Sequence, residues 1–270
     1  ARFWHKVLFD AGVVSTPEPF TKLFNQGMLT AFSFKDKTGR LVPADEVEEH
    51  GDKAVHKTTG EELERVIAKM SKSLKNVVNP DDVIQEFGAD SMRLYEMFMG
   101  PLEQVKPWQM KGVEGVSRFL AKVWRLAFEQ NQEGQWVLSS KLSDEQASTE
   151  THKDLLKVLH ETIKKVSEDI ERLSFNTAIS QMMICTNAFG KAEKLPASLV
   201  RDLLKCLNPF APHITEEINS QLPIANSNTM LCNQDWPTYN EAYLVEDEVE
   251  IVVQVNGKLR GKITVAKDAA

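Results

Sequence analysis

Apolar residues recur at spacings of three and four along this chain from residue 112 to about residue 222. That period matches one face of an α-helix, so the segment predicts amphipathic helices whose apolar faces pack together. The first face holds Val113, Val116, Phe119, Leu120, Val123, Trp124 and Ala127. Further helices are expected over 155–170, 178–190, 199–207 and 212–222, with a polar linker over 130–148. The pattern therefore predicts an antiparallel helix bundle.

Near the end of the chain the period changes to two, which predicts a β-hairpin over 249–265. A two-residue loop at Asn256-Gly257 would place Val255 opposite Lys258 and mix apolar with charged residues on one face. We therefore predict a three-residue loop, 255–257, with Gly257 in a left-handed conformation. The predicted pairs are Val253 with Leu259 and Val249 with Ile263.

The first hundred residues mix helices and strands. A helix is predicted over 2–11, ending at Gly12, and a strand or strand entry over 25–29, with a close backbone approach at Gly27. Residues 30–68 are predicted to form a small β-rich module with a solvated charged surface. Asn79 and Pro80 are typical of a helix start, and a second helix should begin at Asp90 and stop at Gly100-Pro101.

Two lysines three residues apart stand in the run Lys69-Met70-Ser71-Lys72-Ser73. Ammonium and hydroxyl groups donate hydrogen bonds that suit the oxygens of a polyphosphate. We therefore predict a phosphate-binding loop here, and the alternative is a solvated lysine loop. Lys75 is a weaker third candidate.

Other motifs give little. The sequence contains neither G-x-x-x-x-G-K-[ST] nor G-x-G-x-x-G. Gly112–Gly115 matches the G-x-x-G loop of KH domains, but we expect it to open the first bundle helix. The six histidines have no catalytic or metal-ligand spacing, and His213 is expected to begin a helix.

Composition limits the possible partners. No apolar run approaches the roughly 20 residues that span a bilayer, and the net charge is −7. An RNA partner would therefore have to meet local basic patches. The candidates are Arg118, Lys122 and Arg125 in the first bundle helix and Arg260 and Lys262 in the hairpin. The distant cysteines, Cys185, Cys206 and Cys232, favour reduced thiols and no zinc site.

Seven short runs resemble, in the same order, leucyl-tRNA synthetases of bacterial and organellar type, which are class I aminoacyl-tRNA synthetases. The runs are Ala1–Lys6, Asn25–Met28, Lys69–Ser73, Gly88–Asp90 with Met92–Tyr95, Phe175–Ala178, Leu207–His213 and Val253–Lys258. The run Lys69–Ser73, KMSKS in one-letter code, and the run Leu207–His213, which ends in Pro-His, resemble class I synthetases in general. The segment 30–68 and the hairpin resemble leucine enzymes in particular.

The resemblance implies a multidomain, mainly α fold. The implied parts are the end of a Rossmann-like α/β catalytic domain (1–29), a leucine-specific-type insertion (30–68), the KMSKS loop with connecting helices (69–110), a helical anticodon-binding-type domain (111–235) and the first hairpin of an α+β tRNA-binding domain (236–270). The helical pattern that already runs at Ala1 indicates a start inside a larger protein.

The implied reaction is ATP-dependent activation of leucine to leucyl-adenylate, with release of pyrophosphate, and transfer to tRNA(Leu). It implies ATP binding by Lys69, Met70, Ser71, Lys72 and Ser73, with Lys69 and Lys72 catalytic. Mg2+ would accompany the nucleotide, and no protein-bound metal is expected. The partners would be tRNA(Leu), ATP and leucine, without a membrane, and the protein would be a monomer in a chloroplast, a mitochondrion or the bacterial cytoplasm.

The first class I signature, H-I-G-H, does not occur in these residues. We therefore expect the chain alone not to activate leucine. Two alternatives stay open. One is a non-catalytic RNA-binding or scaffold module with a vestigial KMSKS, and the other is a class I synthetase for isoleucine, valine or methionine.

Overall fold

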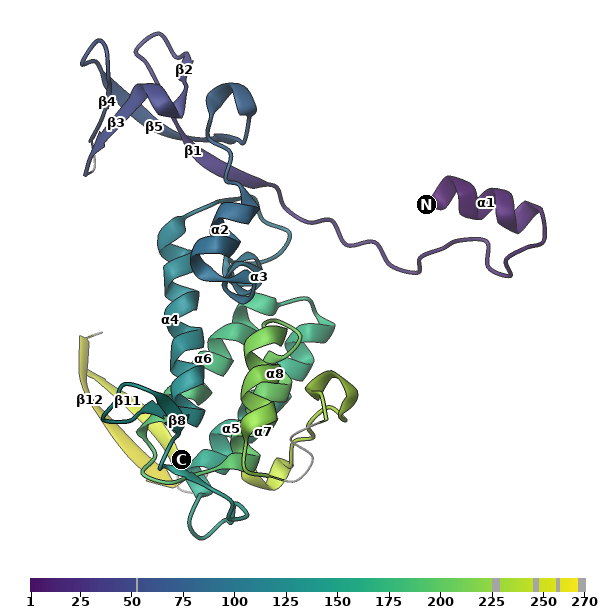
Figure 1. The fold of residues 1–270 in the computed structure, drawn as a ribbon, viewed down its shortest axis with the longest axis vertical. Helices are drawn as coiled ribbons and strands as arrows, with labels where there is room; N and C mark the ends of the chain where they lie inside the picture. The colour runs from purple at the N-terminus through teal and green to yellow at the C-terminus, as the bar shows by residue number, and fades with distance from the viewer. Residues whose placement is uncertain (52, 225–228, 245–247, 256–257, 267–270) are drawn as a thin grey trace. The chain divides into compact units, whose positions relative to one another are not determined.

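The chain divides into two compact units. The computed structural model describes residues 1–51, 53–224, 229–244, 248–255 and 258–266. The first unit comprises residues 1–77 with 101–108, and the second comprises 78–100 with 109–270. A sheet dominates the first unit and helices dominate the second (Figure 1). No helix in the described ranges is long and apolar enough to cross a membrane.

The sheet of the first unit is mostly antiparallel and contains the strands predicted between residues 30 and 68. Its order is β2-β1-β5-β4-β3, and β6 lies parallel to β1. The strands are β1 (Leu29–Lys35), β2 (Leu41–Val42), β3 (Val47–His50), β4 (Lys53–His56), β5 (Glu62–Lys69) and β6 (Lys106–Pro107). A small core of Phe34, Val42, Val47, Ala54 and Leu63 supports the sheet.

Of the two forms predicted over 25–29, a strand or a strand entry, the structure has the entry, because regular pairing begins only at Leu29. Residues 25–28 instead run beside the chain near Gln104, and the Gly27 N–H donates to the Leu102 carbonyl at 2.8 Å. A Cβ atom at Gly27 would lie 2.0 Å from the Gln104 carbonyl oxygen. The predicted close approach at Gly27 is therefore confirmed, and it lies in the entry to β1.

Helix α1 (Arg2–Asp10) forms as predicted and ends before Gly12, whose φ is +72°. None of its residues is buried, and Phe3 and Trp4 are 72% and 67% exposed. Glu18 accepts hydrogen bonds from Arg2 and forms an ion pair with Lys6 at 2.7 Å, which joins the helix to the loop that follows.

The second unit contains the predicted helices, which lie alongside one another (Figure 1). They are α2 (Pro80–Phe87), α3 (Ala89–Phe98), α4 (Met110–Ala127), α5 (Lys153–Glu171), α6 (Phe175–Lys191), α7 (Ala197–Leu207) and α8 (Pro212–Gln221). The core includes the fully buried side chains of Leu159, Ile163, Met182 and Leu203. Asn79 caps α2, since its Oδ1 accepts from the Asp81 N–H at 3.3 Å.

The polar linker predicted over 130–148 contains short strands that the sequence interpretation missed. Strand β7 (Phe128–Gln130) pairs with β8 (Trp136–Leu138), and β9 (Leu142–Ser143) pairs with β10 (Leu195–Pro196). The β7–β8 turn is closed by the Asn131 Oδ1, which accepts from two backbone N–H groups, and by Gly134 with φ +77°. Asn and Gly at these positions are the available turn signal.

The C-terminal hairpin forms from β11 (Glu248–Val255) and β12 (Lys258–Ala266), but with a different turn from the one predicted. Val255 opposes Lys258, which leaves two residues between the strands. The three-residue loop and the pairs Val253–Leu259 and Val249–Ile263 are therefore wrong. The conformation predicted for Gly257 lies outside the described residues.

Beyond an irregularity in its register, the hairpin pairs apolar residues with apolar residues at alternate positions. Gln254 opposes Leu259 and Val253 opposes Gly261, so Arg260 is an extra residue at a β-bulge. Beyond the bulge, Ile251 opposes Ile263. A bulge changes the register by one residue, as an odd loop would, and so also keeps apolar residues on one face.

Two short 3-10 turns precede the hairpin, η3 (Leu231–Asn233) and η4 (Glu241–Tyr243).

Candidate functional site

The two lysines of the predicted phosphate-binding loop are held by different structures. Lys69 is the last residue of β5 and opposes Thr30 of β1 in the sheet. Lys72 begins η2 (Lys72–Leu74), a 3-10 turn directly after the strand. Both side chains are exposed. Within the described ranges, neither ammonium group has a hydrogen-bond or ion-pair partner, so both can meet an incoming anion.

Among the described residues, Lys75, unlike Lys69 and Lys72, has a partner of opposite charge. Its Nζ lies 2.5 Å from the Asp45 Oδ2, and Asp45 belongs to the 3-10 turn η1 (Ala44–Glu46) before β3. The hydrogen bond and the opposite charge raise the pKa of Lys75 and lower the pKa of Asp45. Lys75 also has a φ of +50°, a left-handed conformation that costs a non-glycine residue roughly 1–2 kcal/mol. The charge of Lys75 is thus already paired, in contrast to Lys69 and Lys72.

Asn76 closes the loop that carries these lysines. Its Oδ1 accepts from the Ser71 N–H at 2.8 Å, and its Nδ2 donates to the Ser33 Oγ at 2.8 Å and to the Lys69 carbonyl at 3.3 Å. Ser33 lies on β1 and is only 3% exposed. The Oγ atoms of Ser71 and Ser73 are 2.7 Å apart. One amide side chain therefore joins the loop to a buried position of the sheet.

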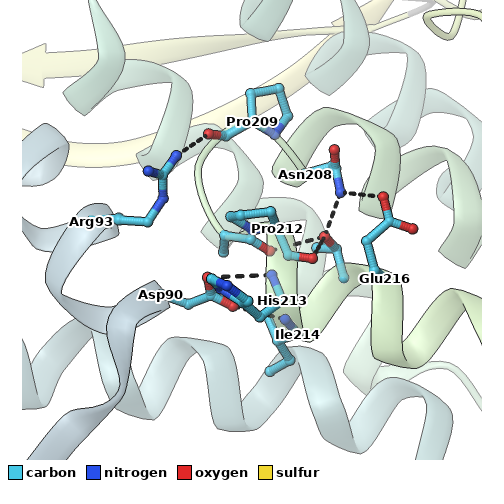
Figure 2. A network of polar contacts seen from close by, with 10 residues as sticks. Asp90, Arg93, Asn208, Pro209, Pro212, His213, Ile214 and Glu216 are labelled. Atoms are coloured by element: carbon cyan, nitrogen blue, oxygen red, sulfur yellow. Dashed lines mark hydrogen bonds and ion pairs between the residues drawn. The ribbon is translucent and has the colours of Figure 1, made fainter. Parts of the chain in front are cut away.

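A polar network in the second unit joins α3 to the start of α8 (Figure 2). Asp90 accepts from the Ile214 N–H at 2.7 Å, from the His213 N–H at 3.4 Å and from the His213 Nδ1 at 2.8 Å. The Asp90 side chain is 9% exposed, whereas that of His213 is 74% exposed. Asp90 thus acts as the N-terminal cap of a helix to which it does not belong.

Further polar contacts fix the turn before α8 (Figure 2). Arg93 donates to the Pro209 carbonyl at 3.0 Å, and the Asn208 Nδ2 donates to Thr215 and Glu216. Glu216 also accepts from the backbone N–H groups of Leu231 and Cys232. His213 lies in the first turn of α8, which agrees with the predicted place at a helix start. Two of the runs behind the family resemblance, 88–95 and 207–213, meet at this junction.

The basic residues predicted on α4 differ in their surroundings. Arg118 pairs with Glu114 at 3.8 Å, and the Lys122 Nζ donates to the Asn187 Oδ1 at 2.9 Å. Arg125 has no hydrogen-bond or ion-pair partner among the described residues. It lies on an open hollow of about 670 Å³ whose lining includes Trp124, Trp136 and His213. The side chains of Arg260 and Lys262 lie outside the described part of the structure.

Comparison with known proteins gives matches along the whole chain. Residues 63–106 match the family "tRNA synthetases class I (I, L, M and V)", and residues 152–270 match "Anticodon-binding domain of tRNA ligase". Leucine--tRNA ligase of Borrelia duttonii (strain Ly) is 48% identical over 268 residues, or 99% of this chain. The enzyme of Borrelia turicatae (strain 91E135) is also 48% identical, over 267 residues.

The chain is homologous to leucine--tRNA ligases. It spans about 30% of the length of these two relatives. A solved structure of a leucine enzyme, described as the ternary complex of Agrobacterium radiobacter K84 agnB2 LeuRS with tRNA and LeuAMS, is similar with a TM-score of 0.63 and 31% identity. That match covers 98% of this chain and 30% of that one. The homologues are enzymes of the aminoacyl-tRNA synthetase class.

Three side chains make contacts in these regions that were not predicted from the sequence. Asn76 was not singled out, although a polar residue soon after a loop can hydrogen-bond back to it. The pairing of Asp45 with Lys75 has no sequence signal, because it depends on how the strands fold. Asp90 was predicted to begin a helix, but its hydrogen bonds to α8 join residues 124 positions apart.

Proposed function

We propose that this chain is the part of a leucine--tRNA ligase that supplies a helical tRNA-binding region and the phosphate-binding loop Lys69–Ser73, which we call the clamp. The complete enzyme would activate leucine with ATP to leucyl-adenylate and transfer it to tRNA(Leu). In this proposal, 1–29 closes the Rossmann-like catalytic domain, 30–68 is an insertion, 69–110 holds the clamp and its connecting helices, 111–235 is the helical domain, and 236–270 opens the C-terminal domain. Identity over nearly the whole chain supports this assignment.

The contrast among the three lysines carries the catalytic part of the proposal. Lys69 and Lys72 are exposed and have no partner in the described ranges, whereas Lys75 is paired with Asp45. Two ammonium groups on lysines three residues apart, both without counterions in the described ranges, favour the oxygens of a triphosphate. Donors that bind more strongly as charge builds on the leaving pyrophosphate raise turnover and not merely affinity. Met70, Ser71 and Ser73 would border the same phosphates.

Mg2+ would enter with the nucleotide. No group of three or more His, Cys, Asp or Glu residues is placed to hold a metal ion in the described part of the chain. The donors of the lysine loop are cationic or hydroxylic, so they fit phosphate oxygens and not a metal cation.

Replacing Lys72 tests the clamp. In the full-length enzyme, we expect Lys72→Ala to lose about 3 kcal/mol of transition-state stabilisation, comparable to the loss of one oxyanion donor. That loss corresponds to a fall of about 150-fold in kcat/KM for leucine-dependent pyrophosphate exchange. The matched control is Lys75→Ala, for which we expect a much smaller fall because Asp45 already neutralises that charge.

Two outcomes would contradict the clamp. Unchanged exchange kinetics in Lys72→Ala would refute the assignment and favour a non-catalytic RNA-binding module with a vestigial motif. An equal loss in Lys75→Ala would show that the free charge at Lys72 is not what matters.

Arg125 is the basic residue of α4 that we propose for contact with the tRNA backbone. It is exposed, has no partner in the described ranges, and lines the same hollow as Trp124 and Trp136. Cations beside aromatic rings suit a phosphate backbone with accessible bases. Arg118 and Lys122 have weaker claims because Glu114 and Asn187 already engage them. Arg260 and Lys262 remain proposals from the sequence.

Binding of tRNA(Leu) as a function of salt tests this contact. Arg125→Glu should weaken binding and reduce the slope of log K against log salt by about one, as expected for loss of one phosphate contact. Arg118→Glu is the matched control on the same helix and should change the slope less. Equal slopes for Arg125→Glu and the unmodified enzyme would remove Arg125 from the interface.

A further inference from the structure

The two lysines of the segment 69–72 are held by different structures. Lys69 is fixed by strand pairing with Thr30, whereas Lys72 lies beyond the sheet in a 3-10 turn. The spacing of the two ammonium groups therefore depends on the conformation of Met70 and Ser71. A device that fixes these two residues would control how both lysines meet the same triphosphate.

The contacts of Asn76 provide such a device. Its Oδ1 accepts from the N–H of Ser71, directly before Lys72, and its Nδ2 donates to the carbonyl of Lys69. The same Nδ2 lies 2.8 Å from the Oγ of Ser33, which is buried in β1. One planar amide thus contacts the backbone on both sides of Met70 and anchors it to the strand beside Lys69.

The position of Asn76 is itself defined. Lys75, which precedes it, has a φ of +50°. This left-handed residue ends the 3-10 turn and reverses the chain, so that the Asn76 side chain points back at Ser71. Side-chain amides that close short loops in this way are a known alternative to regular secondary structure.

We infer that Asn76 is a positioning residue for the proposed activation of leucine. It holds Lys72 relative to Lys69 and does not contact the nucleotide itself. This inference rests on the clamp function proposed above. Because misplacement of a catalytic group by about 1 Å can cost on the order of 100-fold, loss of the amide should affect turnover more than binding of ATP.

The test is leucine-dependent pyrophosphate exchange with the full-length enzyme carrying Asn76→Ala. We expect kcat to fall about 10- to 100-fold while KM for ATP changes less than about 3-fold, because loop placement and not charge is lost. Asn76→Asp retains an acceptor for the Ser71 N–H but loses the amide donor, so its activity should be intermediate. Asn131→Ala is the matched control, since it removes a turn-closing Asn that does not touch the lysine loop.

A double-mutant cycle separates positioning from general destabilisation. If Asn76 acts through Lys72, adding Asn76→Ala to Lys72→Ala should lower kcat by less than about 3-fold further. Multiplicative losses in the double variant would overturn the inference, as would a loss in Asn131→Ala equal to that in Asn76→Ala. If Lys72→Ala alone has no effect, the proposed clamp fails. If Lys72→Ala is impaired and Asn76→Ala is not, only the positioning role fails.

Discussion

Asp90→Ala should destabilise the helical unit without touching the lysine loop. The substitution removes the carboxylate that accepts from the Ile214 and His213 N–H groups and from the His213 ring. The first turn of α8 would then lack its acceptor. Pro212 has no N–H to satisfy, so the loss falls on the two amides that follow it.

The size of the effect follows from the geometry. Loss of a helix cap costs about 0.5–2 kcal/mol. A carboxylate at a partly buried helix N-terminus adds up to about 2 kcal/mol. The Asp90 side chain is only 9% exposed and its bond to the Ile214 N–H is 2.7 Å, so values near the upper end apply. We expect a loss of about 3 kcal/mol, or about 6–12 °C in Tm for a unit of this size.

Thermal unfolding of the 270-residue chain, followed by circular dichroism at 222 nm, measures this change. Hydrogen exchange at the Ile214 amide reports the local loss directly. The matched control is His213→Ala, which removes only the ring contact. Because the His213 side chain is 74% exposed, this pair should contribute at most about 1 kcal/mol.

Two results would refute the reasoning. If Asp90→Ala and His213→Ala shift Tm equally, the cap on the backbone is not the important contact. If the Ile214 amide is equally protected in Asp90→Ala and the unmodified chain, another group satisfies the N-terminus of α8.

Three further predictions concern other parts of the chain. Gly27→Ala should lower the free energy of unfolding of the first unit by about 3 kcal/mol or more, because the added Cβ would lie 2.0 Å from the Gln104 carbonyl oxygen. Gly115→Ala in α4, with nothing within 4 Å, should instead raise Tm slightly in the same assay. The carboxyl of Glu18 should titrate by NMR near a pKa of about 2, lowered by Arg2 and Lys6 from an ordinary 4.5, so its ion pairs are complete above pH 4.5 and lost as pH falls through 2. A midpoint near 4.5 would disprove those contacts. Iodoacetamide at pH 8 should label Cys232 alone in the native chain, because burial raises the pKa of Cys185 to about 12 and that of Cys206 further; native labelling of either buried thiol, read by mass spectrometry, would count against this.

The helices could be predicted from the sequence because each one buries a single face against its neighbours. Val113, Val116 and Val123 recur at helical spacing and are fully buried in α4. The caps at Asn79 and Gly12 depend on nearby residues, so they too could be predicted. Free cysteines were expected, and the structure confirms them, with two buried and Cys232 exposed.

Two kinds of feature could not be predicted. Some depend on contacts between residues far apart in the sequence, and one could arise equally well from either of two backbone geometries. An odd loop and a bulge both shift the hairpin register by one, so the alternation of apolar residues could not distinguish them. The pairing of Asp45 with Lys75 follows from the path of β2 and β3 and not from local spacing. The contact of Asn76 with Ser33 joins residues 43 positions apart. These long-range contacts lie at the candidate sites.

The cap formed by Asp90 has a consequence for synthesis of the protein. Asp90 and Ile214 are separated by 124 residues. At about 5–20 residues per second, a ribosome needs roughly 6–25 seconds to make that interval. During this time the carboxylate of α3 is present without the amides it will cap, while α4 to α7 emerge between them. The hydrogen bonds between Asp90 and the start of α8 can therefore form only after α4 to α7 have been synthesised, so this contact is made late in the synthesis of the helical unit.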